Sequence, residues 1–255
     1  MAAPLPKATE LADRLAQIGQ DAVLDEFALR RIVADARKLI STDAAKAHDV
    51  LGQVAALQWD VSALRRHYRS AISLGDPVLG LWNYSTALFL VGEAGESYEA
   101  ARDAWRKAPD DLALLDDLIA SALHDGRFGE AQALCGRRRK MAPRQEPPIA
   151  SVVKELVKAV GQGEFSEAGA RRALRSADSI RSEARARPHG IKIVPSQHEP
   201  GSFLFEYRLI TSPAAAGDLN EALALRWAES PEARADPGLK FLPMFIGTVV
   251  DGGCA

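Results

Sequence analysis

The sequence of 255 residues has little cysteine, few aromatic residues and no long apolar run. Its two cysteines, Cys135 and Cys254, cannot build a disulfide framework, so a reducing cytoplasm is the expected location. No apolar run approaches the roughly 18 residues of a membrane span, and we expect no membrane partner. The opening segment lacks the apolar core of a secretory signal and carries acidic residues instead, in MAAPLPKATELADRLAQ. Aromatic residues make up only 6% of the chain, whereas Ala, Leu and Arg are abundant, a mixture that favours helix.

An excess of charge of either sign is also missing. The formal net charge is −2 and the pI is about 6.2, whereas a dedicated nucleic-acid binder is usually basic overall. Two basic segments depart from this balance: the run GRRRKMAPR, which begins at Gly136, and the Arg-rich stretch from Arg171 to Arg187. We interpret both as solvated helix faces, with an acidic partner or RNA as the alternative.

A repeat organises the middle of the chain. Gly92 and Gly126 are separated by 34 residues, and so are Pro109 and Pro143. Two helices of about a dozen residues and two short turns fill such a period. We expect each glycine to end the first helix of a pair in a left-handed conformation, and each proline to follow the second helix. The acidic pair after Pro109, at residues 110–111, suits the positive end of the next helix.

Within this period the chain resembles the tetratricopeptide repeat (TPR) family. The stretch GRFGEAQAL resembles the family's turn into its second helix through Gly126, Phe128 and Ala131. The preceding repeat matches the signature spacings at Leu81, Tyr84, Ser85, Leu88, Gly92, Ala94, Ala104 and Pro109. Weaker matches stand on either side, at Val61, Leu64, Tyr68 and Ala71, and at Gly163, Phe165 and Ala168.

The resemblance implies a mainly α fold, a TPR-like superhelix of antiparallel helical hairpins. With an upstream hairpin at residues 5–18 and 24–40, helical repeats would cover residues 5–187. The chain departs from the family where Arg138 and Arg175 replace a small packed alanine, and its first helices lack the full Trp–Leu–Gly–Tyr signature. A helical bundle without solenoid stacking is the alternative.

The pattern changes after Pro188. GIKIVP and SFLFEYRLI predict two strands, and the second would place Phe203, Phe205, Tyr207 and Leu209 on one face. Residues 218–221 resemble a capping box that opens a helix to about Ser230. FLPMFIGTVV predicts a third strand, with Pro243 at an edge or a bulge. We therefore predict a repeat domain over residues 1–188 and a small β-β-α-β subdomain over 189–255, which docks on the repeats, on a partner, or on a second copy in a homodimer.

Few residues of the sequence could form a catalytic or metal-binding site. His48, His67 and His124 fall in predicted helices, with no carboxylate or cysteine at metal-ligand spacing. His198 and Glu199, with Tyr207 on the next strand, are the best candidate site, since a histidine beside a glutamate can act as a general base; a polar turn is the simpler interpretation. Cys135 is expected to be a packed residue. The sequence has neither a phosphate-binding loop nor a dinucleotide fingerprint, and we predict no catalytic residue, cofactor or metal.

The resemblance implies a scaffold or adaptor that binds a protein or peptide on the concave face of its repeats. The family's groove spacing selects nine residues here: Leu79, Trp82, Asn83, Thr86, Phe89, Asp116, Ala120, Leu123 and His124. Some family members grip a terminal carboxylate with Lys, Arg and Asn. Asn83 matches one such position, but Ala113 and Asp117 stand at the basic ones, which argues against that binding mode.

Two further functions stay open. TPR-like helices often accompany glycosyl-, methyl- or hydroxyl-transfer enzymes, so the chain could be an accessory subunit of a modifying enzyme. About 65 residues after Pro188 are too few for those catalytic folds, and no iron-binding His-x-Asp/Glu motif is present. The third possibility is a nucleic-acid-associated regulator that uses the arginine run.

Overall fold

A computed structural model describes residues 7–21, 23–147, 149–196, 199, 201–229 and 240–248. In this part of the chain a series of ten helices precedes a small sheet. The helices are α1 (Lys7–Gln20), α2 (Glu26–Leu39), α3 (Ala44–Leu57), α4 (Val61–Leu74), α5 (Pro77–Leu90), α6 (Ala94–Lys107), α7 (Leu112–His124), α8 (Phe128–Met141), α9 (Ala150–Gly161) and α10 (Glu167–Glu183). None of the helices in the described ranges is both long enough and apolar enough to cross a bilayer.

Aspartate side chains start half of these helices. Asp25, Asp43, Asp60, Asp76 and Asp111 each accept a hydrogen bond from a backbone N–H in the first turn of the helix that follows. Such caps satisfy donors that have no partner inside the helix, and the negative charge suits the helix dipole. The acidic pair expected to open a helix after Pro109 therefore does so through its second member.

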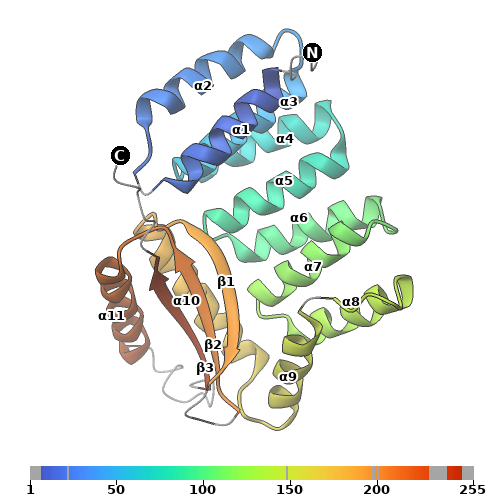
Figure 1. Ribbon diagram of the computed structural model, residues 1–255, viewed down its shortest axis with the longest axis vertical. Helices are drawn as coiled ribbons and strands as arrows, with labels where there is room; N and C mark the ends of the chain where they lie inside the picture. The colour runs from blue at the N-terminus through green and yellow to red at the C-terminus, as the bar shows by residue number, and fades with distance from the viewer. Residues whose placement is uncertain are drawn as a thin grey trace.

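Helices that are adjacent in sequence pack against each other. The closest pairs are α3 with α4, α5 with α6 and α7 with α8. The first helix α3 also contacts the first helices α1 and α5. Figure 1 shows the helices α1 to α9 following an arc, with the sheet on its inner side. The structure thus confirms a mainly α fold built from a run of consecutive helices that pack on their neighbours.

The glycines and prolines of the 34-residue period take the expected roles. Gly92 follows α5 with φ +83°, and Gly126 follows α7 with φ +69°, both in the left-handed region. Pro109 and Pro143 lie just beyond the ends of α6 and α8. Space is a second reason for glycine, because a Cβ at Gly92 would lie 2.9 Å from a backbone oxygen of α10, and one at Gly126 would lie 2.7 Å from an α10 side chain.

Helix α10 departs from the expected repeat. Instead of completing a close pair with α9, it packs against strand β3 and helix α11, and it crosses the turns that follow α5 and α7. The prediction that repeats continue to residue 187 is therefore wrong for this helix. Its arginines form buried contacts that a repeat helix does not need, as described below.

The C-terminal part has the predicted order β-β-α-β. Strand β1 (Pro188–Pro195) pairs antiparallel with β2 (Phe203–Leu209), and β2 pairs parallel with β3 (Phe241–Gly247) after the crossover helix α11 (Pro213–Glu229). Pro243 lies in β3, an edge strand, as predicted. The expected capping box at residues 218–221 is wrong: α11 begins at Pro213, and the hydroxyl of Ser212 accepts from the backbone N–H of Ala215 at 3.2 Å. Proline suits the first helical position because no N–H is needed there.

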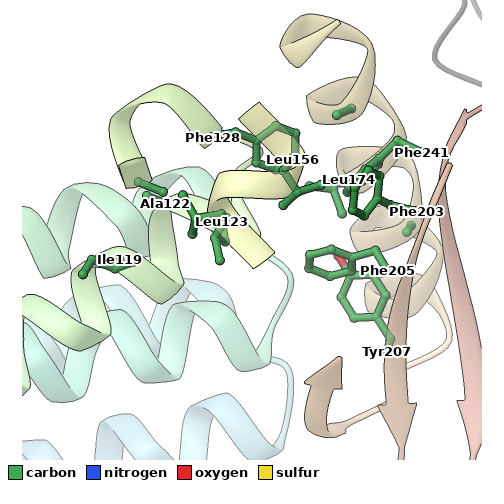
Figure 2. Close-up of a cluster of buried hydrophobic side chains, with 14 of the residues drawn as sticks. Ile119, Ala122, Leu123, Phe128, Leu156, Leu174, Phe203, Phe205, Tyr207 and Phe241 are labelled. Carbon is green, nitrogen blue, oxygen red and sulfur yellow. The ribbon is translucent and has the colours of Figure 1, made fainter. Parts of the chain in front are cut away.

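The sheet shares its core with the helices. Phe203, Phe205, Tyr207 and Leu209 alternate along β2 and are all buried, which confirms the predicted apolar face. Figure 2 shows Phe205 and Tyr207 directed toward α10 and the helical array, near Leu123. These side chains belong to one cluster of buried residues that extends from α6 to β3. The change from helix to strand occurs at Pro188, but this hydrophobic core continues across it.

Candidate functional site

A cavity of about 780 Å³ lies between the first helices of the array and the start of the sheet. Its walls come from α1, α3, α4 and α5 on one side and from β1 and the ends of β2 and β3 on the other. The apolar part of the wall consists largely of small and aliphatic side chains: Leu15, Ala16, Ala56, Leu57, Ala87, Leu90, Pro188 and Ile210. Its size is in the range of cavities that bind ligands.

The polar part of the wall is organised by one carboxylate. Asp49 of α3 accepts a hydrogen bond from the Asn83 amide at 3.1 Å and another from the Gln53 amide at 3.0 Å. Both amides line the cavity, as does Tyr68, whose hydroxyl also interacts with Asp49. Burial raises the pKa of the Asp49 carboxyl, and the hydrogen bonds from Asn83 and Gln53, with the nearby Tyr68 hydroxyl, oppose that rise.

Arg187 closes one side of the cavity. Its guanidinium donates to the backbone oxygen of Gly19 at 2.9 Å and to that of Asp21, at the C-terminal end of α1. The last carbonyl groups of a helix have no partner inside the helix and carry partial negative charge, so a cation is favoured there. Burial lowers the pKa of Arg187, and the nearby Asp21 opposes that shift. This contact joins the start of β1 to the first hairpin, 168 residues earlier in the chain.

The residues predicted to bind a partner divide into two groups. Asn83 and Thr86 line the cavity, and Thr86 is exposed. Leu79 is also open to solvent, with 49% of its surface exposed. Trp82 is half-buried and donates its indole N–H to Asp117 of α7, which links neighbouring hairpins. This group lies on α5, where a partner can reach at least three of the side chains.

The second group packs against the chain itself. The ring of His124 stacks on Phe89 with 4.6 Å between centroids, and its other neighbour is Phe205 of β2 at 6.1 Å. Burial lowers the pKa of His124 to about 4, so the imidazole is neutral at physiological pH. Leu123 is buried in the cluster shown in Figure 2. The inner face of the array at α7 is therefore covered by the sheet.

Arg181 of α10 is hydrogen-bonded to the C-terminal end of α5. Its side chain is fully buried and donates to the backbone oxygen of Leu90 at 2.7 Å and to that of Phe89 at 2.9 Å. It also donates to the buried carboxylate of Asp178 at 2.9 Å, and its guanidinium lies over the ring of Tyr207. Burial raises the pKa of Asp178 to about 6, although Arg181 lowers it.

The basic residues of α8 mostly form contacts with other residues of the chain. Arg138 is buried and donates to Asp116 at 2.9 Å, which neutralises a residue predicted to face a partner. Arg137 lies over the ring of Trp105, and Arg139 pairs with Glu146 at 3.3 Å. Arg138 thus occupies a core position as an ion pair, which accounts for the absence of the small residue that the repeat pattern favours there. Ala120, the remaining predicted residue, is half-buried on α7.

Sequence reasoning missed one pairing of histidines. His48 of α3 and His67 of α4 lie with their Nδ1 atoms 3.0 Å apart, a distance at which one ring donates and the other accepts. The sequence pattern predicts helices for both residues, but it does not predict their pairing. Burial lowers the pKa of His67, and the proximity of His48 adds to this shift. Within the described ranges, no group of three or more His, Cys, Asp or Glu residues could hold a metal ion.

Of the candidate pair at the hairpin between β1 and β2, Glu199 is exposed and its backbone N–H donates to Ser196. His198 lies outside the described residues, as does Cys254. Cys135 is buried, as expected for a packed residue, and burial raises the pKa of its thiol. A thiol in this environment is a poor nucleophile.

No protein-family model matches the chain, and no curated protein shows significant sequence similarity to it.

Proposed function

We propose that this chain is a TPR-like protein-interaction module, and that it binds an extended segment of a partner protein in the cavity between α1, α3, α5 and the sheet. The observation that carries the proposal is the position of the cavity. Its helical walls are mainly the first helices of successive pairs, on the inner side of the arc, and two residues of the predicted groove line it. Helical arrays of this kind use their inner surface for binding.

The composition of the walls supports a peptide ligand. Ala16, Ala56 and Ala87 leave room for a main chain to approach the helices closely. The side chains of Asn83 and Gln53 each carry both a donor and an acceptor, as a peptide bond does. Apolar walls with a few placed polar groups are typical of sites that fix the orientation of a ligand.

The sheet covers part of the inner face of the array and so limits where a partner segment can bind. His124 contacts Phe205 of β2, Phe89 stacks on His124, and Leu123 is buried in the same core as β2, so the partner segment would occupy only the N-terminal part of the arc. The proposed binding surface therefore consists of the cavity together with the exposed side of α5, rather than the full length of the array.

A selection from a phage-displayed library of random peptides tests the proposal. Peptides that bind should lose affinity by at least about tenfold in Thr86→Trp, because the bulky indole would project from the α5 wall of the cavity. Ser73→Trp is the matched control: Ser73 is also exposed on a helix, and its hydroxyl bonds to a carbonyl one turn earlier at 3.2 Å, as that of Thr86 does at 3.4 Å. Equal binding to both variants would place the peptide elsewhere and contradict the proposal.

A further inference from the structure

Asp49 carries a charge that the described part of the chain does not balance. Three side chains interact with it, those of Asn83, Gln53 and Tyr68, and all three are neutral. No lysine, arginine or histidine of the described residues forms an ion pair with it, although burial penalises the charged form of its carboxyl. Asp49 is half-buried, and a carboxylate that is partly withdrawn from water is stabilised by a cation beside it.

The two amides also leave acceptors without partners. A carboxylate only accepts, so Asn83 and Gln53 must direct their NH₂ groups toward Asp49. Their carbonyl oxygens have no hydrogen bond within the described residues. The cavity wall therefore offers two amide oxygens that accept hydrogen bonds, and the Asp49 carboxylate lies directly behind these amides.

We infer that this part of the cavity binds a positively charged side chain of the partner segment, the ammonium of a lysine or the guanidinium of an arginine, with Asp49 as its counter-ion. The inference rests on the proposed function and specifies the chemistry of its ligand. An ammonium or guanidinium group supplies several N–H donors and one positive charge, which matches the acceptors and the charge at this site.

The other ionisable groups nearby form hydrogen bonds with groups other than Asp49. Arg187, the cation in the cavity wall, donates to the carbonyl groups at the end of α1. His189 lines the same wall and its Nδ1 contacts the backbone oxygen of Arg208. His48 precedes Asp49 in the chain, but its ring is bonded to His67 of α4. Each of these groups is thus held by a partner other than Asp49.

A double-mutant cycle tests the inference with a peptide taken from the phage selection above. The peptide is made with its lysine free or acetylated, which keeps the shape and removes the charge; for an arginine, citrulline replaces it. Affinities are measured for the wild-type chain and for Asp49→Asn. We expect acetylation to weaken binding to the wild type by at least about tenfold and to change binding to Asp49→Asn by less than twofold.

Asp117→Asn is the matched control, since burial raises the pKa of that carboxyl too and it also accepts one side-chain hydrogen bond, from Trp82. Neither Asp117 nor its partner Trp82 lines the cavity, whereas both amides bonded to Asp49 do, so the effect of acetylation should stay at the wild-type level. A pH series on the wild type provides a second measurement that does not require Asp49→Asn to fold. Protonation of Asp49 at low pH should weaken binding of the free-lysine peptide and leave binding of the acetylated peptide unchanged. His189→Gln should keep this difference, which excludes His189 as its source.

The possible failures can be told apart. If no peptide is selected, or if Thr86→Trp leaves binding intact, the proposed function itself is contradicted, and the inference is overturned with it. If peptides bind in the cavity but contain no cation, or if acetylation weakens binding to the wild type and to Asp49→Asn equally, only the role of Asp49 is overturned.

Discussion

Replacing Arg181 with methionine removes the guanidinium that joins α10 to the C-terminal end of α5, while the longer part of the side chain is retained. Three hydrogen bonds of 2.7 to 2.9 Å are lost, to Leu90, Phe89 and Asp178. The carboxylate of Asp178, only 3% exposed, is then left without its cation. Breaking one partner of a buried ion pair costs about 3–5 kcal/mol. We expect Arg181→Met to lower the free energy of unfolding by that amount.

The double variant Asp178→Asn/Arg181→Met separates the charge from the packing. It removes the unpaired carboxylate, so about 1–3 kcal/mol should remain, mainly the cost of the Leu90 carbonyl left without a donor. The Phe89 carbonyl still accepts from the backbone N–H of Gly92 at 3.1 Å. Urea unfolding followed by circular dichroism measures all three proteins. A loss below about 1 kcal/mol in Arg181→Met, or a double variant that is less stable than the single one, would refute the role assigned to this arginine.

The pH dependence of Arg181→Met gives an independent check. In the wild type, burial already raises the pKa of Asp178 to about 6, above its value in the unfolded chain, and loss of the arginine raises it further. A carboxyl with a raised pKa in the folded state favours folding most at low pH, and this benefit is lost as the pH rises through the folded value. The deficit of Arg181→Met relative to wild type should therefore be smaller at pH 5 than at pH 7.

Other predictions concern the turns, the sheet and a buried histidine. Gly126→Ala should cost at least about 1 kcal/mol in urea unfolding because φ is +69° and α10 lies close, whereas Gly136→Ala, inside α8 with nothing within 4 Å, should be neutral or stabilising. Residues 189–255 expressed alone should give poorly dispersed NMR amide signals, because the apolar face of β2 is buried against the helices; a folded monomer would contradict this. Burial lowers the pKa of His124 to about 4, so the stability that the neutral imidazole contributes is present above pH 6.5 and is lost on acidification. The His124→Phe variant should therefore lose less stability than the wild type between pH 7 and pH 5.

The helical array was predictable because its signals are local. Gly92 and Gly126 needed a left-handed conformation, Pro109 and Pro143 could not continue a helix, and the residues between them had the right spacing. The alternation along β2 identified its buried face for the same reason. The start of α11 was missed because Pro213 is a better first residue than the pattern at residues 218–221, and both patterns can open a helix.

The binding surface was harder to predict because it depends on contacts between distant segments. Spacing along α5 and α7 placed Phe89 and His124 on the inner face, but it could not reveal that the two rings stack on each other or that β2 packs against His124. The arginines of α10 and the end of α8 indicated a solvated face by composition. Arg138 and Arg181 are instead buried, and each is paired with an aspartate. Asp49 and its amide partners come from two helices whose facing sides are set only by packing.

Hydrogen exchange with a selected peptide bound tests most directly whether the partner occupies the cavity. Segments 86–90 of α5 and 187–190 at the start of β1 contribute residues to opposite walls, so a peptide between them should slow amide exchange in both segments together. Segments outside the cavity, such as α8, should exchange at the rate of the free protein. Protection confined to the second helices of the pairs, with none at residues 86–90 or 187–190, would contradict binding on the inner face of the array.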